Sequence, residues 1–278
     1  MINLKKKLGL STIPKKYYDS VATEYDNDYG NIYTETSALA YEQITKHLQT
    51  ENPKVLDIAA GTGNILAKLQ QKYPNAAFTA NDASKNMLAI TKEKIGNQNT
   101  FINDCLKNIG DNIEPNSQDL ILAHYVMCFV DSEWSILKSL EMLKPGGFLS
   151  IITTTKCNLH ELRTKYFVKT SKILGANSSI EKAYIPSSID HLTNDIIPDT
   201  ASIQSALLYN KEISFANDVD IRSYLIDSGW AASYMNNGFK FKQALINFIS
   251  SSMYRANKSK FPISATSDVA IVLVQKPS

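Results

Sequence analysis

The sequence has few cysteines and no long apolar run. Its 278 residues contain three cysteines, Cys105, Cys128 and Cys157, which are far apart and show no CxxC spacing. Such spacing is typical of free thiols in a reducing compartment and excludes a disulfide scaffold. No apolar stretch reaches the roughly 18 residues of a membrane helix, and the polar N-terminus lacks the apolar core of a signal peptide. We therefore expect a cytoplasmic protein that does not bind a membrane.

The sequence also lacks a strong charge of either sign. Lys and Arg number 29 against 27 Asp and Glu, a balance that argues against a dedicated nucleic-acid partner. His and Cys show no metal-ligand spacing and no clear carboxylate cluster stands out, so no metal is expected. The composition is that of a globular protein, long enough for one domain with an insertion or for two small domains. We expect a monomer or a homodimer.

Strand-like and helix-like segments alternate over the first half of the chain. Ser84 is the expected N-cap of one helix and Gly96 its end, while Pro145-Gly146-Gly147 is expected to stop another. The strands read as continuous apolar runs, as in a parallel sheet covered on both faces. The pattern predicts a doubly wound α/β sheet. The expected strands are 54–60, 76–82, 100–104, 119–124 and 148–155, and the expected helices are 64–73, 84–95 and 132–143.

The segments outside this alternation suggest three further parts. Residues 15–49 read as two helices within an N-terminal helical segment, 1–49. Residues 156–215 lack a βαβ rhythm and contain Pro186 and Pro198, so we interpret them as an inserted cap. The core is then expected to comprise 50–155 and 216–278, with helices at 217–230 and 241–254 and a last strand at 268–275.

Glycines at the end of the first strand indicate a ligand site. In VLDIAAGTGN (55–64), Gly61 and Gly63 fall in the first strand-to-helix turn, where an open α/β sheet binds ligands. A dinucleotide fingerprint needs a third glycine where this chain has Leu66, and no P-loop pattern occurs. Asp82 ends the second strand and can accept from both ribose hydroxyls, while Asp104 can accept from an exocyclic amine. This set suits a cofactor with amino, ribose and adenine groups but no phosphate.

Five sequence blocks now occur in an ordered series: VLDIAAGTGN, ANDASKNML, FINDC, QDLILAHYVMCFV and LKPGGFLSIITTT. The series resembles the class I S-adenosylmethionine-dependent methyltransferases of small-molecule type, over about residues 50–155. The resemblance implies a Rossmann-like, doubly wound, mostly parallel seven-stranded sheet with N-terminal helices and a cap inserted after the fifth strand. It also implies S-adenosyl-L-methionine as the cofactor.

The resemblance assigns roles to individual residues along the cofactor. The methionine end is expected at Asp57, Ala59, Gly61 and Gly63, with Ala59 where the family often has glycine. The ribose is expected at Asp82 and Ala83, and the adenine at Met87, Asp104 and Cys105. YYDSVATEYD (17–26) resembles a lid that closes the site, which implies that Tyr17, Tyr18 and Tyr25 cover the cofactor.

The expected reaction is methyl transfer to a nucleophilic nitrogen or oxygen of a small organic molecule, mainly by proximity and in-line alignment. His124 and Tyr125 follow the fourth strand and are expected to face the methyl group. His124 is the candidate general base if the acceptor arrives protonated, and otherwise shapes the pocket. Two alternatives stay open: a protein of the same fold that binds this cofactor without methylating, and a nicotinamide-dependent oxidoreductase.

Overall fold

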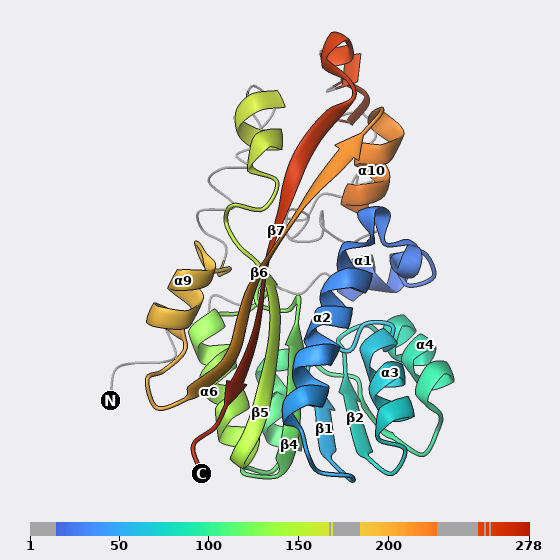
Figure 1. The fold of residues 1–278 in the computed structure, drawn as a ribbon. Coiled ribbons are helices and arrows are strands. Elements are labelled where there is room, and N and C mark those ends of the chain that lie inside the picture. Colours follow the sequence, from blue (N-terminus) through green and yellow to red (C-terminus); the bar gives the residue numbers. More distant parts are fainter. Residues whose placement is uncertain (1–14, 167, 169–183, 227–249, 253, 256) are drawn as a thin grey trace.

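The computed structural model describes residues 15–166, 168, 184–226, 250–252, 254–255 and 257–278. A seven-stranded sheet runs through this part of the chain in the order β3-β2-β1-β4-β5-β7-β6 (Figure 1). Only β7 runs antiparallel to its neighbours. The predicted seven-stranded, mostly parallel sheet is thus confirmed. The strands are β1 (Lys54–Asp57), β2 (Ala77–Asn81), β3 (Thr100–Ile102), β4 (Gln118–His124), β5 (Leu143–Thr154), β6 (Ser202–Phe215) and β7 (Ile263–Gln275).

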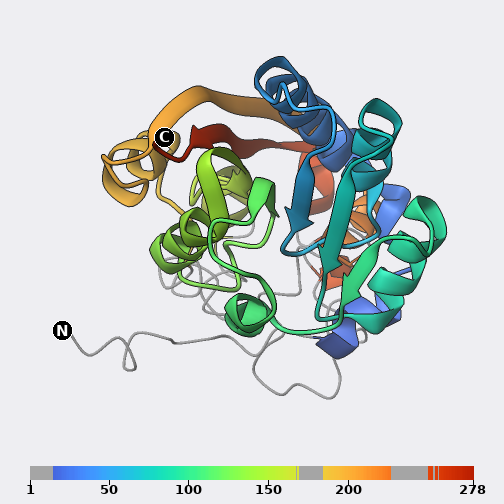
Figure 2. The ribbon, with the colours of Figure 1, turned by 90° about the horizontal axis from the view of Figure 1, so that it is seen from below.

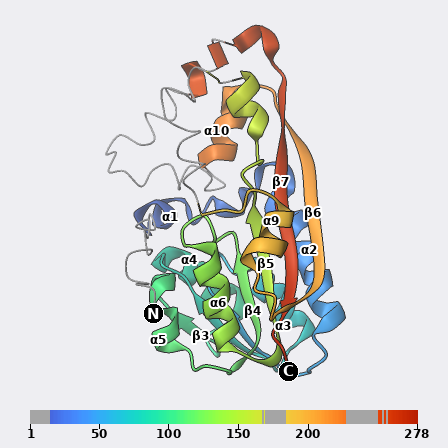
Figure 3. The same cartoon turned by 90° about the vertical axis from the view of Figure 1, so that its left-hand side faces the viewer.

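Helices cover both faces of the sheet (Figures 2 and 3). On one face, α2 (Ile32–His47), α3 (Asn64–Lys72) and α4 (Lys85–Ile95) pack on the strands. On the other face lie α5 (Ile109–Asn112), α6 (Ser132–Met142) and a helical stretch made of α9 (Ile189–His191) and the turn Leu192–Ile196. Both faces of the central strands are therefore buried, which explains their continuous apolar sequence. Fully buried side chains on these strands include Val55, Leu56, Leu120, Ile121 and Leu122.

From residue 15 on, the N-terminal segment is largely helical, as predicted. It contains α1 (Lys15–Val21), two short 3-10 turns (Tyr25–Asn27 and Tyr29–Asn31) and α2. The Asp28 carboxylate starts α2, because its two oxygens accept hydrogen bonds from the Tyr33 and Thr34 N–H groups at 3.0 and 2.7 Å. Helix α1 packs against α4 on the other side of the glycine turn, so the segment crosses from the sheet to the expected cofactor site.

The range expected to be a cap, 156–215, contains a strand of the sheet. Its last fourteen residues form β6, which pairs with β7 from Ser202–Gln275 to Phe215–Ile263. The interpretation of 202–215 as cap was therefore wrong. As the edge strand, β6 is exposed along much of its length, and its register shifts between Ile203 and Ser205. An exposed strand of this kind lacks the continuous apolar sequence by which the inner strands were predicted.

The paired strands β6 and β7 extend well beyond the other strands (Figure 1). Helix α10 (Asp218–Ile226) packs beside this extension, within the range 217–230 expected to be helical. Strand β7 starts five residues before the expected 268. Shorter turns lie at Leu106–Asn108, Leu162–Tyr166 and Lys258–Lys260. Most of the helix expected at 241–254 lies outside the described residues.

Two local predictions have different outcomes. Ser84 caps α4 as expected, because its Oγ accepts from the Met87 N–H at 3.2 Å, and Gly96 ends the helix. Helix α6 ends at Met142, however, and Pro145-Gly146-Gly147 lies inside β5 rather than before it. A Cβ at Gly147 would come within 3.0–3.2 Å of three backbone carbonyl oxygens. Glycine thus allows the strand to continue where its ladder with β4 shifts register.

Candidate cofactor site and active site

The expected site lies where the strand order reverses. Strand β1 pairs with β2 on one side and β4 on the other, so the carboxyl ends of β1 and β4 open at a topological switch point. Asp57 is the last residue of β1, His124 is the last of β4, and Asp82 follows β2. The fold therefore brings these predicted residues to one edge of the sheet.

The glycine turn is held in place by the end of β2. The Gly61 N–H donates to Asp82 Oδ2 at 2.9 Å, and the Ala60 N–H donates to the Asn81 carbonyl at 2.8 Å. The buried Asn81 side chain donates through Nδ2 to the Ile58 carbonyl at 2.9 Å. These contacts fix both ends of the turn, so its backbone is arranged before any ligand binds.

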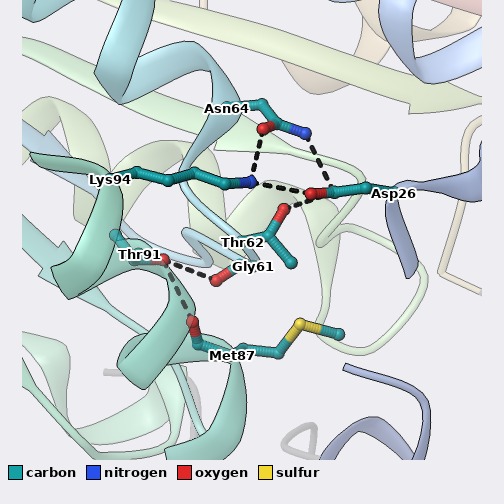
Figure 4. Close-up of polar contacts among 7 residues, drawn as sticks. All are labelled: Asp26, Gly61, Thr62, Asn64, Met87, Thr91 and Lys94. Atoms are coloured by element: carbon teal, nitrogen blue, oxygen red, sulfur yellow. Dashed lines mark hydrogen bonds and ion pairs between the residues drawn. The ribbon is translucent and has the colours of Figure 1, made fainter. Parts of the chain in front are cut away.

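The two glycines have different surroundings. Both have positive φ, +54° at Gly61 and +77° at Gly63. A Cβ at Gly63 would meet Thr91 Cγ2 of α4 at 2.7 Å, whereas a Cβ at Gly61 would meet only a Tyr25 ring carbon at 3.8 Å. Thr91 also donates from Oγ1 to the Gly61 carbonyl at 2.7 Å (Figure 4). Gly63 thus allows the close packing of α4, while Gly61 faces the Tyr25 ring.

Two carboxylates flank the turn, Asp57 buried and Asp82 partly buried. Asp57 is 2% exposed, and its Oδ1 accepts from the Ala59 N–H at 3.2 Å. Asp82 accepts from the N–H groups of Gly61 and Ser84. Burial raises the pKa of Asp57 to about 7 and that of Asp82 to about 6, against the opposing effect of these hydrogen bonds. Within the described chain neither carboxylate forms an ion pair, so both can accept hydrogen bonds or bind positive charge.

The remaining residues expected around the ribose and the adenine differ in burial and in hydrogen bonding. Met87 is 1% exposed at the start of α4. The Ala83 carbonyl accepts from Asn103 Nδ2 at 3.1 Å. Asp104 Oδ1 accepts from the Cys105 N–H at 2.7 Å and from Asn108, and these bonds lower the pKa of Asp104. The two groups expected to contact the adenine are therefore bonded to each other here.

The tyrosines expected to cover the cofactor belong to one connected group of rings. Tyr18 contacts Tyr17, Tyr25 and Phe129 edge-on, with ring centroids 5.6, 6.1 and 5.9 Å apart. Tyr25 stacks on Tyr33 at 5.6 Å. Burial raises the pKa of Tyr18 and of Tyr25, with a further contribution from the nearby Asp82 carboxylate. Both hydroxyls are therefore neutral at physiological pH.

The end of β4 presents Tyr125 and His124. Tyr125 has φ +54°, contacts the Tyr33 ring edge-on at 4.6 Å, and its hydroxyl lies 2.9 Å from Thr36 Oγ1. A bulky residue at positive φ is strained, a feature that clusters at functional sites. His124 Nε2 lies 2.9 Å from Ser150 Oγ, and burial lowers the pKa of His124 to about 3. The imidazole is therefore neutral at physiological pH.

Two acidic residues of the lid were not predicted as part of the site. Asp19 Oδ1 accepts from Ser84 Oγ at 2.6 Å, at the start of α4. Asp26 accepts from Thr62, Asn64 and Lys94. Both lie in YYDSVATEYD, but their partners are 36 to 68 residues further along the chain. No local spacing signal could have identified these contacts.

Two other kinds of feature are absent from the described ranges. No three His, Cys, Asp or Glu side chains there lie close enough to hold a metal ion. None of the helices in those ranges has both the length and the apolar character needed to span a bilayer.

Comparison with known proteins agrees with this geometry. The family described as Methyltransferase domain matches residues 56–149. The malonyl-[acyl-carrier protein] O-methyltransferase of Priestia megaterium is 29% identical over 171 residues, 59% of this chain and 60% of that protein. The ubiquinone/menaquinone biosynthesis C-methyltransferase of Desulfotalea psychrophila is 28% identical over 148 residues, 51% and 58% of the two chains. The matched part is thus less than two thirds of either relative.

A solved structure shows the same fold. It is the Haemonchus contortus phosphoethanolamine N-methyltransferase 2 in complex with phosphomonomethylethanolamine and S-adenosylhomocysteine. The TM-score is 0.56 at 17% identity, over 96% of this chain and 60% of that one. Residues 56–149 thus match a methyltransferase domain, and the proteins that this chain resembles carry the names of methyltransferases. The resemblance of the five sequence blocks is thereby confirmed.

Proposed function

We propose that this protein transfers the methyl group of S-adenosyl-L-methionine to a nucleophilic nitrogen or oxygen of a small organic molecule. The observation that carries the proposal is a pair of carboxylates, the buried Asp57 and the partly buried Asp82, beside a hydrogen-bonded glycine turn that Tyr25 approaches. When bound, the cofactor supplies an activated methyl group on a sulfonium. We further propose 1–49 as the lid and the part of 156–215 before β6 as the cap.

The carboxylates fit the donor groups of this cofactor. A carboxylate oxygen has more than one acceptor position, so the backbone bonds to Asp57 and Asp82 leave capacity for a ligand. The raised pKa values mean that ionising these groups is unfavourable without a donor or a positive charge nearby. Ribose hydroxyls suit Asp82, and the positively charged amino-acid end suits the region of Asp57.

The start of α3 argues against a nicotinamide dinucleotide. In dinucleotide-binding folds the pyrophosphate sits at the N-terminus of the helix after β1. Here the Asp26 carboxylate occupies the first turn of that helix, bonded to Thr62 Oγ1 at 2.6 Å and Asn64 Nδ2 at 2.9 Å. A pyrophosphate there would have to displace this carboxylate and its ion pair with Lys94 at 2.7 Å. The oxidoreductase alternative is therefore disfavoured by this junction as well as by Leu66.

The end of β4 supports alignment rather than base catalysis. A base with a pKa near 3 accepts a proton poorly from an acceptor at neutral pH, and His124 already interacts through Nε2 with Ser150. We propose that His124 and the strained Tyr125 orient the acceptor and exclude water. An amine or phenol acceptor would then have to react in its deprotonated form or lose its proton to solvent.

The nature of the acceptor atom is inferred from the aromatic residues near the site. The three similar proteins carry names for O-, C- and N-methylation. We favour a small nitrogen or oxygen nucleophile because aromatic rings gather near the glycine turn and the end of β4, and such surroundings suit a small organic molecule.

A titration followed by a transfer assay tests the proposal. Calorimetry with S-adenosyl-L-methionine should show micromolar binding, while NADH as the control should not bind. Labelled-methyl transfer is then measured against panels of amines, phenols, carboxylates and carbon nucleophiles. Transfer to a carbon nucleophile alone would refute the N or O assignment. Binding without transfer to any acceptor, with the cofactor returned unchanged, would instead favour a non-methylating protein of this fold.

A further inference from the structure

Asp26 forms the centre of a polar junction between the lid and the cofactor site (Figure 4). Its Oδ1 accepts from Thr62 Oγ1 at 2.6 Å and from Asn64 Nδ2 at 2.9 Å. Its Oδ2 accepts from Lys94 Nζ at 2.7 Å, and Lys94 also donates to Asn64 Oδ1 at 2.6 Å. One carboxylate thus joins the lid to the glycine turn, to α3 and to α4.

The junction holds the residue that covers the glycine turn. Tyr25 precedes Asp26 and places a ring carbon 3.8 Å from the position that a Cβ at Gly61 would take. On its other side Tyr25 stacks on Tyr33. Thr62 lies between the two glycines, so Asp26 fixes Tyr25 and the turn relative to each other. A change at Asp26 is therefore expected to reach the cofactor through Tyr25.

The junction is placed to open without disturbing the core. The side chains of Lys94 and Asp26 are 27% and 40% exposed. Water can therefore replace these hydrogen bonds at small cost, unlike contacts inside the sheet. Three donors on a single ionised acceptor still make a stronger junction than an isolated surface pair.

We propose that Asp26 is a positioning residue that holds Tyr25 over the glycine turn and thereby sets how fast the nucleoside cofactor leaves the site. The inference rests on the proposed function. Asp26 does not contact the reacting atoms. Its effect is on the closed position of the lid, while Lys94 supplies the positive charge that keeps the carboxylate in place.

The test compares Asp26→Asn, Lys94→Met and the double variant with a matched control. The control is Lys138→Met, which removes a lysine of equal exposure (27%) from its ion pair with Glu141, at 2.8 Å. The first readout is amide hydrogen exchange of residues 22–31 in the cofactor-free protein. The second is the dissociation rate of S-adenosylhomocysteine, measured by competition after rapid mixing. Thermal melting is recorded for every variant.

We expect Asp26→Asn and Lys94→Met each to speed exchange in residues 22–31 and to raise the dissociation rate about tenfold. The double variant should be no faster than the faster single variant, because both changes break one junction. Lys94→Arg should restore slow dissociation. The melting temperature should stay within about 2 °C of wild type, as for an exposed ion pair, and Lys138→Met should change neither readout.

Two results would overturn the inference. One is unchanged exchange and dissociation in Asp26→Asn, with wild-type protein binding the cofactor normally. The other is a double variant whose effect is the product of the single effects, which would mean that the residues act independently. Failure of the proposed function is recognised separately, because wild-type protein would then bind no S-adenosylhomocysteine.

Discussion

Replacing Gly63 by alanine should destabilise the protein through contact with helix α4. The new Cβ would lie 2.7 Å from Thr91 Cγ2 and 3.1 Å from the Thr91 Cα and Cβ. Two of these atoms belong to the α4 backbone or sit directly on it, so they cannot move away as the end of a flexible side chain can. The substitution thus combines overpacking with a positive φ of +77°.

The expected loss follows from both effects. A left-handed conformation costs a non-glycine residue about 1–2 kcal/mol, and overpacking a buried contact costs about 1–3 kcal/mol. The free energy of unfolding should fall by about 2–5 kcal/mol, which lowers the melting temperature by about 4–10 °C in a chain of this size. Chemical denaturation monitored by circular dichroism gives the first quantity, and thermal denaturation gives the second.

Gly61→Ala is the matched control. Its φ is also positive, +54°, but among the described residues its Cβ would contact only Tyr25, at 3.8 Å, so only the conformational cost of about 1–2 kcal/mol applies. A third variant, Gly63→Ala with Thr91→Ser, removes the nearest methyl group and keeps the hydroxyl that bonds to Gly61. It should recover part of the loss. If Gly63→Ala is no less stable than Gly61→Ala, the packing argument is wrong.

Four further predictions concern the carboxylates and His124. Because burial raises the pKa of Asp57 to about 7 and of Asp82 to about 6, cofactor binding should weaken below pH 6 and release protons near pH 6.5. Calorimetry in buffers of different ionisation enthalpy measures this release, and equal enthalpies would contradict it. The same shifts disfavour ionisation in the folded state, so their contribution makes the free energy of unfolding fall as pH rises from about 4 to 7. Asp82→Ala should weaken cofactor binding by about 1–3 kcal/mol, and unchanged affinity would refute the ribose assignment. His124→Gln should change KM more than kcat, whereas a large loss of kcat alone would restore His124 as a base.

Much of the core could be predicted from local sequence. Apolar runs predicted β1, β2, β4 and most of β5, because a strand buried on both faces has no polar alternation to obscure it. Ser84 predicted the start of α4, because N-capping depends only on a side chain and the next few N–H groups. Strand β6 was missed because it is an exposed edge strand. Polar and apolar residues are mixed along such a strand, so it has no continuous apolar run.

Some residues of the candidate site could likewise be predicted from local sequence, and others could not. Asp57, Gly61 and Asp82 could be placed from sequence because each follows a strand, and parallel strands end at one edge of the sheet. The packing role of Gly63 could not be predicted, because it depends on the close approach of Thr91 from helix α4.

The sequence by itself determined the alternation of strands and helices, the glycine turn and the acids at the strand ends, because these depend on neighbours along the chain. Only the tertiary structure decided the surroundings of those residues. It buried Asp57 and Asp82 deeply enough to raise the pKa of each. It also brought Asp26 to Lys94, 68 residues away. Burial and long-range contacts depend on how the elements pack together, and no local pattern encodes that packing.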